Sequence, residues 1–465
     1  PNTAASPAPW GRIVTILRWN DGTLGRRLAL FATVLFVVAV ASSIHAWTRG
    51  SDATYMPSVA TQRETIREQL AALEQRVAGQ PGDLDGLTQL ASSYLQRARE
   101  TGDPSFYTLA STAVQRALDA DPNSVPTLVV FGSLALSRHD FAGALAIGLH
   151  ARSLAPDVVA TYGVITDANV ELGRYDDAIA SAQQLADAHP DLAAYSRISY
   201  IRELNGDVDG AIASMQQAID SSSGVPQDEV WSRELLANLY LTNGNVAAAE
   251  IQIQRAALLL PDDPATQEGL ARLATIQGDN ASAEAHLQQA ITQRPLMQYV
   301  IELGDLLSSE GRGGAAQQQY ALVGAMKQLF AANGVDADME VALFDADHHI
   351  NTENAYQTAL AAYARRSSIY GADAVAWTAF KAGDLDSAQR YMTLARRLGT
   401  QDPRLAYHAG VIEQASGQQA AAVRDLSYAL SRSALLSALD AHAIRQMLAA
   451  AASAAETAGA IATTH

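Results

Sequence analysis

Five consecutive residues, Asp345-Ala346-Asp347-His348-His349, form the densest group of metal-capable side chains in the sequence. Carboxylates and imidazoles are ligands for zinc or manganese. Adjacent histidines on a helix point about 100° apart, so a shared metal ion would need a loop at this place. A polar helix end explains the group without a metal. An envelope metal-binding protein or enzyme centred on Asp345 to His349 is therefore kept as an alternative only.

Other signatures of catalysis are missing from the sequence. It contains no G-x-S-x-G, no G-x-x-x-x-G-K-[ST], no H-E-x-x-H and no G-x-G-x-x-G motif. It has no cysteine, which excludes disulfides, thiolate nucleophiles and iron–sulfur clusters. The net charge of −17 argues against nucleic acid as the main partner, because phosphate binding needs a basic surface. We therefore predict a protein that is not an enzyme and has no cofactor.

A turn motif, Gly-x-(aromatic or apolar)-x-x-Ala, recurs along the chain with a period of about 34 residues. A histidine takes the first position in the first copy, and the 72-residue step from Gly311 to Gly383 equals two irregular units of 36. The eight turn residues are His139, Gly173, Gly206, Gly244, Gly278, Gly311, Gly383 and Gly417. Glycine allows the left-handed backbone that ends one helix, and the alanine five residues later allows two helices to pack closely. The pattern predicts pairs of antiparallel helices.

Prolines at a constant phase close the second helix of several units, namely Pro122, Pro156, Pro190, Pro261 and Pro295. With this period and these motifs, residues 83–435 resemble the tetratricopeptide repeat family. The runs 197–220, 318–349 and 370–412 look like a group of poorly characterised bacterial tetratricopeptide proteins. The resemblance implies an all-α fold, an α-solenoid of about nine helix-turn-helix repeats wound into a right-handed superhelix. An irregular stretch at 330–351 should form a longer helix or an inserted loop.

The resemblance also implies a concave face, lined by the first helix of each repeat, that binds other proteins. Trp231 could equally anchor a partner or pack on the preceding loop. Some family members grip a carboxylate with Lys, Asn and Arg at fixed groove positions. Here only Asn238 matches, so we expect a basic or neutral partner. The candidate groove residues are Tyr200, Glu203, Trp231, Glu234, Asn238, Glu268, Arg272, Asp305, Arg404 and Tyr407.

An uncharged segment of twenty residues, Leu28 to Trp47, reads LALFATVLFVVAVASSIHAW. As a helix it would span about 30 Å, the thickness of the hydrocarbon core of a bilayer. Residues 1–27 hold four arginines and one aspartate, which places the N-terminus in the cytoplasm by the positive-inside rule. A short interfacial helix near residues 9–20 fits the same region. The expected membrane-interface residues are Trp10, Arg12, Arg18, Trp19, Arg26, Arg27 and Trp47.

These observations predict a chain in five parts. A cytoplasmic segment (1–27) precedes a single transmembrane helix (28–47), a linker with a first helix (48–82), the solenoid (83–435), and a C-terminal capping helix with an alanine-rich tail (436–465). The solenoid would lie outside the cell membrane as a scaffold for subunits of an integral-membrane complex. Ala39-Val40-Ala41 would also suit signal cleavage, so a secreted soluble repeat protein is the other alternative.

Overall fold

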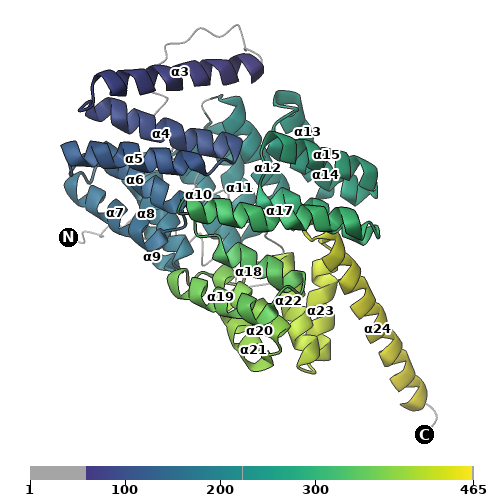
Figure 1. The fold of residues 1–465 in the computed structure, drawn as a ribbon. Coiled ribbons are helices and arrows are strands. Elements are labelled where there is room, and N and C mark those ends of the chain that lie inside the picture. Colours follow the sequence, from purple (N-terminus) through teal and green to yellow (C-terminus); the bar gives the residue numbers. More distant parts are fainter. Residues whose placement is uncertain (1–58, 223, 463–465) are drawn as a thin grey trace, which may run out of the picture.

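The computed structural model describes residues 59–222 and 224–462, and this part of the chain is helical throughout, without a strand (Figure 1). None of its helices is long and apolar enough to cross a bilayer. The predicted membrane segment at 28–47 and its flanking interface residues lie outside the described residues.

Ten helical hairpins follow one another, each made of two neighbouring helices in close contact. The first five pairs are α4 (Leu84–Thr101) with α5 (Ser105–Ala120), α6 (Val125–Ser137) with α7 (Phe141–Leu154), α8 (Ala160–Glu171) with α9 (Tyr175–Ala188), α10 (Leu192–Leu204) with α11 (Val208–Asp220), and α12 (Pro226–Thr242) with α13 (Val246–Leu259). The others are α14 (Pro264–Gln277) with α15 (Asn280–Gln293), α16 (Met297–Ser309) with α17 (Gly313–Ala332), α18 (Asp338–Asp347) with α19 (Thr352–Arg365), α20 (Ile369–Ala382) with α21 (Leu385–Ala395), and α22 (Pro403–Ala415) with α23 (Gln419–Leu430).

Three elements flank the hairpins. Helix α3 (Val59–Gly79) packs on α4 at the start of the array. A short 3₁₀ turn, η2 (Ser433–Leu435), leads to α24 (Ala438–Ala462), which contacts α16 and α23. The far end of α24 projects away from the rest of the molecule (Figure 1).

The turn motif has the predicted geometry. All eight turn residues have positive φ angles, from 61° at His139 to 90° at Gly383. The alanine five positions later is at most 1% exposed in every copy, from Ala144 to Ala422. An Asp or Asn next to the turn, such as Asp207 or Asn245, accepts a hydrogen bond from the third residue of the following helix and caps it. Turn, cap and close approach are thus set by three neighbouring sequence positions.

The hairpins number ten in the described part, against the nine or so that we predicted. The irregular stretch at 330–351 accounts for part of the difference. It contains the end of a long helix, α17, and the whole of the short α18, whose turn to α19 has positive φ at His349 and Asn351. Two non-glycine residues thus make the turn that the glycine spacing missed.

The superhelix closes on itself. Loops of the later repeats touch the turns of the early repeats through contacts between residues 190 to 197 positions apart. Arg294 binds the carbonyl of Arg99, Ser367 that of Leu172, and Arg432 that of Thr242. One superhelical turn therefore takes between five and six repeats of about 34 residues. We call this row of contacts the seam. It joins the ends of α4, α6, α8, α10 and α12 to the segments that follow α15, α17, α19, α21 and α23.

Candidate functional site

Closure of the seam leaves a cavity of about 420 Å³ inside the superhelix. Helices from both turns line it, including α4, α14, α16, α18, α22 and α24, so it exists only when the turns are in contact. Its wall is apolar with inserted charged groups. The charged lining residues are Arg99, Arg272, Arg294, Glu302, Asp305, Glu340, Asp347, Arg404 and Asp440, together with His139.

Three of the ten predicted groove residues line this cavity: Arg272, Asp305 and Arg404. Asp305 is 6% exposed and accepts hydrogen bonds from Tyr320 Oη at 2.9 Å and His348 Nε2 at 3.0 Å. These residues face inward as the groove prediction requires. They face an enclosed space, however, because the next superhelical turn covers what would be an open concave face.

A ladder of glutamates runs along the inner face at a spacing of 34 residues: Glu234, Glu268 and Glu302. Arg272 binds Glu268 and the side-chain oxygen of Asn238, which joins two repeats. Burial, reinforced by Glu268, raises the pKa of Glu234 well above its usual range and that of Glu302 to about 8. One arginine does not compensate three buried carboxylates, so this side of the interior favours a positively charged guest.

Four other predicted groove residues are involved in packing or partly buried. Tyr200 and Tyr407 are each 6% exposed and belong to hydrophobic clusters. Trp231 packs against the cluster around Leu192 and Met215, in line with its packing interpretation. Burial, with Asp402 nearby, raises the pKa of Glu203 to about 8. Whether any of the ten residues binds a partner stays a prediction.

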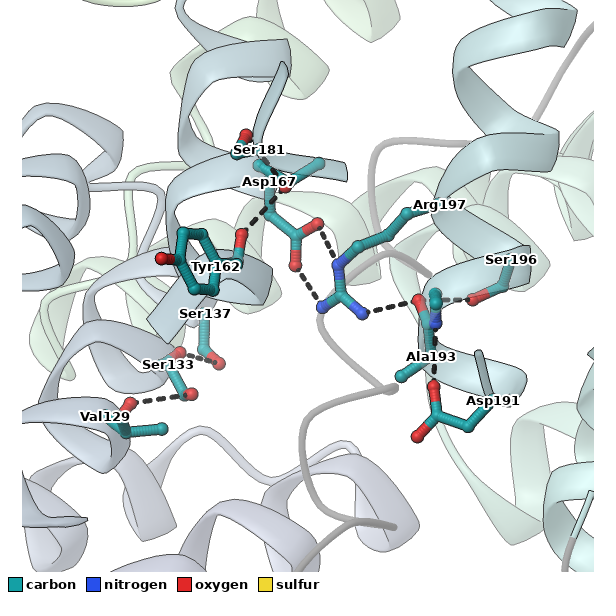
Figure 2. A network of polar contacts seen from close by, with 12 residues as sticks. Val129, Ser133, Ser137, Tyr162, Asp167, Ser181, Asp191, Ala193, Ser196 and Arg197 are labelled. Atoms are coloured by element: carbon teal, nitrogen blue, oxygen red, sulfur yellow. Dashed lines mark hydrogen bonds and ion pairs between the residues drawn. The ribbon is translucent and has the colours of Figure 1, made fainter. Parts of the chain in front are cut away.

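A buried ion pair joins two repeats beside Gly163 of α8. Figure 2 shows Arg197 of α10 reaching Asp167 of α8, with Nε–Oδ1 and Nη2–Oδ2 distances of 2.8 and 2.7 Å. Its Nη1 donates to the carbonyl of Ala193 at 2.9 Å. A Cβ at Gly163 would lie 3.2 Å from the guanidinium, so glycine makes room for it. Arg197 is 1% exposed and serves the contact between repeats.

The group Asp345 to His349 does not converge. His348 turns to the carbonyl of Phe344 and to Asp305, whereas Asp347 accepts from Trp377 Nε1 at 2.6 Å. Burial opposes protonation of His348, but the hydrogen bond and charge of Asp305, the carbonyl of Phe344 and the charge of Asp347 together outweigh it and raise the pKa. Within residues 59–222 and 224–462 no three His, Asp or Glu side chains are placed to hold a metal ion. The geometry therefore gives the metal alternative no support.

Sequence reasoning missed several lining residues. Glu302 could have been found, because it follows Glu268 by one repeat period. Arg99 and Arg294 could not, because they are 195 residues apart and meet only through the pitch of the superhelix. Asp440 belongs to the C-terminal helix, which the sequence assigned only a capping role.

Comparisons with known proteins agree with the helical repeats. The family model described as "Tetratricopeptide repeat" matches residues 167–226 and 234–297. A comparison with curated proteins finds no match.

A comparison with solved structures finds similar chains at low identity. A tetratricopeptide repeat protein from Parabacteroides merdae is 17% identical, with 53% of this chain and 99% of that chain covered and a TM-score of 0.39. A monomeric mutant of IFIT1 with Gppp-AAAA is 12% identical over 71% of this chain and 76% of that one, with a TM-score of 0.45. Cut9 with Hcn1 of the APC/C is 11% identical over 84% and 88%, with a TM-score of 0.41. The chain thus carries tetratricopeptide repeats in an all-helical solenoid, the architecture of a scaffold for protein–protein contacts.

Proposed function

We propose that the protein is a membrane-anchored scaffold that holds partner proteins at the cell membrane, as an accessory or assembly subunit of an integral-membrane complex. The segment Leu28 to Trp47 would be the anchor, with the N-terminus in the cytoplasm and the solenoid on the other side. The mechanism is complementarity of shape and charge along a preorganised surface.

The observation that carries this proposal is the closed repeat array. Stacked hairpins present long outer faces, and contacts between turns keep those faces in one arrangement, so little ordering is needed when a partner binds. Helix α13 offers an apolar site on the outside. Leu258 is 85% exposed and Ile251, two helical turns away on the same face, is 48% exposed. We assign this pair to contact with an apolar segment of a partner subunit.

The test is affinity capture of the full chain in mild detergent, followed by identification of the proteins recovered. We expect at least one integral-membrane protein, and we expect its recovery to fall in the double variant Ile251→Glu/Leu258→Glu. The matched control is Leu109→Glu, since Leu109 is a 43% exposed leucine on α5. Recovery of the bare chain alone would count against the scaffold, and equal recovery with both variants would count against α13.

The secreted alternative is separated by a second measurement. The intact mass and N-terminal sequence of the mature chain show whether residues 28–47 are retained. Retention together with fractionation in the membrane supports the anchor. A chain that begins after Ala41 would support a secreted repeat protein.

A further inference from the structure

The interior cavity has a part lined by arginines that no carboxylate pairs. Arg294 Nη1 donates to the backbone carbonyl of Arg99 at 3.2 Å, so the Arg294 guanidinium reaches the end of α4 across the seam, and both side chains line the cavity. Arg99 itself donates to Gln96 at 2.8 Å. Among the described residues neither guanidinium makes an ion pair, and the Nε atom of each is buried without a hydrogen-bond partner. Burial lowers the pKa of Arg99 although Glu100 and Asp228 oppose it, whereas at Arg294 burial is outweighed by Tyr299, Asp263 and Glu268, which raise the pKa.

A second part of the same cavity has the opposite character. Glu302, Asp305, Asp347 and Asp440 all line it, and Arg404 and Lys381 are cations close enough to act on the carboxyl groups of Asp347 and Asp440. Glu302 and Asp440 make no ion pair in the described part of the chain. The hydroxyl of Tyr370, another lining residue, is buried and unpartnered. Among the described residues, Glu302 and Asp440 thus lack an ion-pair partner and Tyr370 Oη lacks a hydrogen-bond partner.

Between the charged parts the wall is apolar. Leu296, Met297, Ile301, Leu343, Phe344 and Leu436 contribute to it. A volume of about 420 Å³ lies within the range of roughly 300–1,000 Å³ that is usual for small-molecule sites. A folded partner cannot enter such a space, but a molecule of a few hundred daltons can.

We propose that this cavity binds a small zwitterionic ligand of the short-peptide type, with its carboxylate at Arg99 and Arg294, its ammonium group at Glu302 and Asp440, and an apolar body between them. A buried polar or charged group without a partner is unfavourable, and a ligand with both charges supplies a partner at both ends, with the ammonium group binding Glu302 and Asp440 as carboxylates. The ligand would also bridge the two superhelical turns, because Arg99 lies in the first turn and Glu302 in the later one. The proposal is independent of membrane anchoring and of any protein bound outside.

The test is isothermal titration calorimetry of the purified full chain in detergent with three zwitterions, leucyl-leucine, leucyl-glycine and leucyl-glycyl-glycine. Hexanoate and hexylamine are the probes with only one charge. We expect at least one peptide to bind tenfold or more tightly than either single-charge probe. Absence of binding by all three peptides would overturn the proposal. Binding of hexanoate or hexylamine as tight as that of the peptides would overturn it as well.

Two variants locate the site. Arg294→Gln should weaken peptide binding at least tenfold and leave hexylamine unchanged, whereas Glu302→Gln should weaken both. The control is Arg255→Gln on the outer face of α13, where the side chain is exposed. Circular dichroism of each variant checks that the fold is retained. Peptide binding that is equal in wild type and in both cavity variants, with the fold intact, would place the peptide elsewhere and refute the assignment.

Discussion

Arg197 lies between two repeats and donates to both carboxylate oxygens of Asp167 through Nε and Nη2. Burial raises the pKa of Asp167 to about 6 against the pull of Arg197, which still leaves the carboxylate ionised at pH 7. The pair is thus a true ion pair in a dry environment. Each member of the pair is stabilised mainly by the other, since removal of one leaves the other charged and buried.

Replacing Arg197 by methionine should therefore destabilise the solenoid by about 3–5 kcal/mol, the usual loss when one member of a buried pair is removed. The measurement is urea unfolding followed by circular dichroism. The double variant Asp167→Leu/Arg197→Met should recover most of the loss, and Arg255→Met on the surface should change little. A single variant as stable as wild type would show that water reaches Asp167.

Ionisation of the buried carboxyl group of Glu302 should destabilise the folded state. Its pKa is raised from 4.5 to about 8, first by burial and then by Glu268. The charged or polar groups that face it are Glu268 and Arg272 from α14 and Gln298 and Asp305 from α16. The folded state holds a proton here that the unfolded chain releases, so stability falls as the pH rises from about 4.5 to 8.

The variant Glu302→Gln should remove this loss, because the amide has the shape of the protonated acid and does not ionise. We expect equal thermal midpoints for variant and wild type at pH 5 and a higher midpoint for the variant at pH 9. The slope of the difference is at most about 1.4 kcal/mol per pH unit. Asp176→Asn, at an exposed carboxylate, should show no such divergence. A constant difference at all pH values would mean that Glu302 ionises freely.

At the scale of helices, the sequence was informative where structure is local. The Gly–Ala motif located eight turns because the left-handed backbone and the close packing are each fixed by one residue. The motif did not predict the turn after α18, because His349 and Asn351 adopt positive φ angles there in place of glycine. The seam could not be predicted for a different reason. The pitch of the superhelix depends on small rotations summed over six repeats, and no single sequence position determines it. The sequence therefore could not predict which residues the seam brings together around the cavity, such as Arg99 and Arg294.

Two turn glycines separate local from long-range effects. Gly173 and Gly278 have similar φ angles, 70° and 78°. A Cβ at Gly278 would meet nothing within 4 Å, whereas one at Gly173 would lie 2.3 Å from the carbonyl oxygen of Ser367 across the seam. Gly278→Ala should lower the free energy of unfolding only by the cost of a left-handed backbone at alanine, about 1–2 kcal/mol.

We expect Gly173→Ala to lower the free energy of unfolding further, because the added Cβ also forces the two sides of the seam apart. The measurement combines the thermal midpoint with amide hydrogen exchange at Ile369, whose N–H donates to Tyr175 Oη at 2.8 Å. Exchange at Ile369 should be faster in Gly173→Ala and unchanged in Gly278→Ala. Equal exchange at Ile369 in the two variants would mean that the two superhelical turns already separate transiently at this point in the wild type.

For the whole molecule, the seam decides whether the solenoid is an open spring or a closed body. Arg366 is its best-connected side chain. It is 5% exposed, its Nε lies 2.7 Å from Glu171 in the early turn, and its Nη1 lies 3.1 Å from Glu340 in the later turn. The guanidinium also lies over the ring of Phe141, 5.1 Å from the centroid. Four segments thus meet on one cation.

Arg366→Met should open the molecule, because Glu171 and Glu340 would then face each other without a cation and gain by hydration once the turns part. We expect a larger radius of gyration by small-angle scattering, faster exchange along the seam, and loss of any ligand held in the cavity. The control is Arg312: it pairs with Glu284 and Glu310 inside one turn and is about half exposed, so Arg312→Met should leave all three readouts unchanged. If Arg366→Met keeps the wild-type radius and exchange pattern, the backbone contacts hold the turns by themselves. The cavity would then be a permanent feature of the fold, and a ligand could reach it only by a route other than separation of the turns at Arg366.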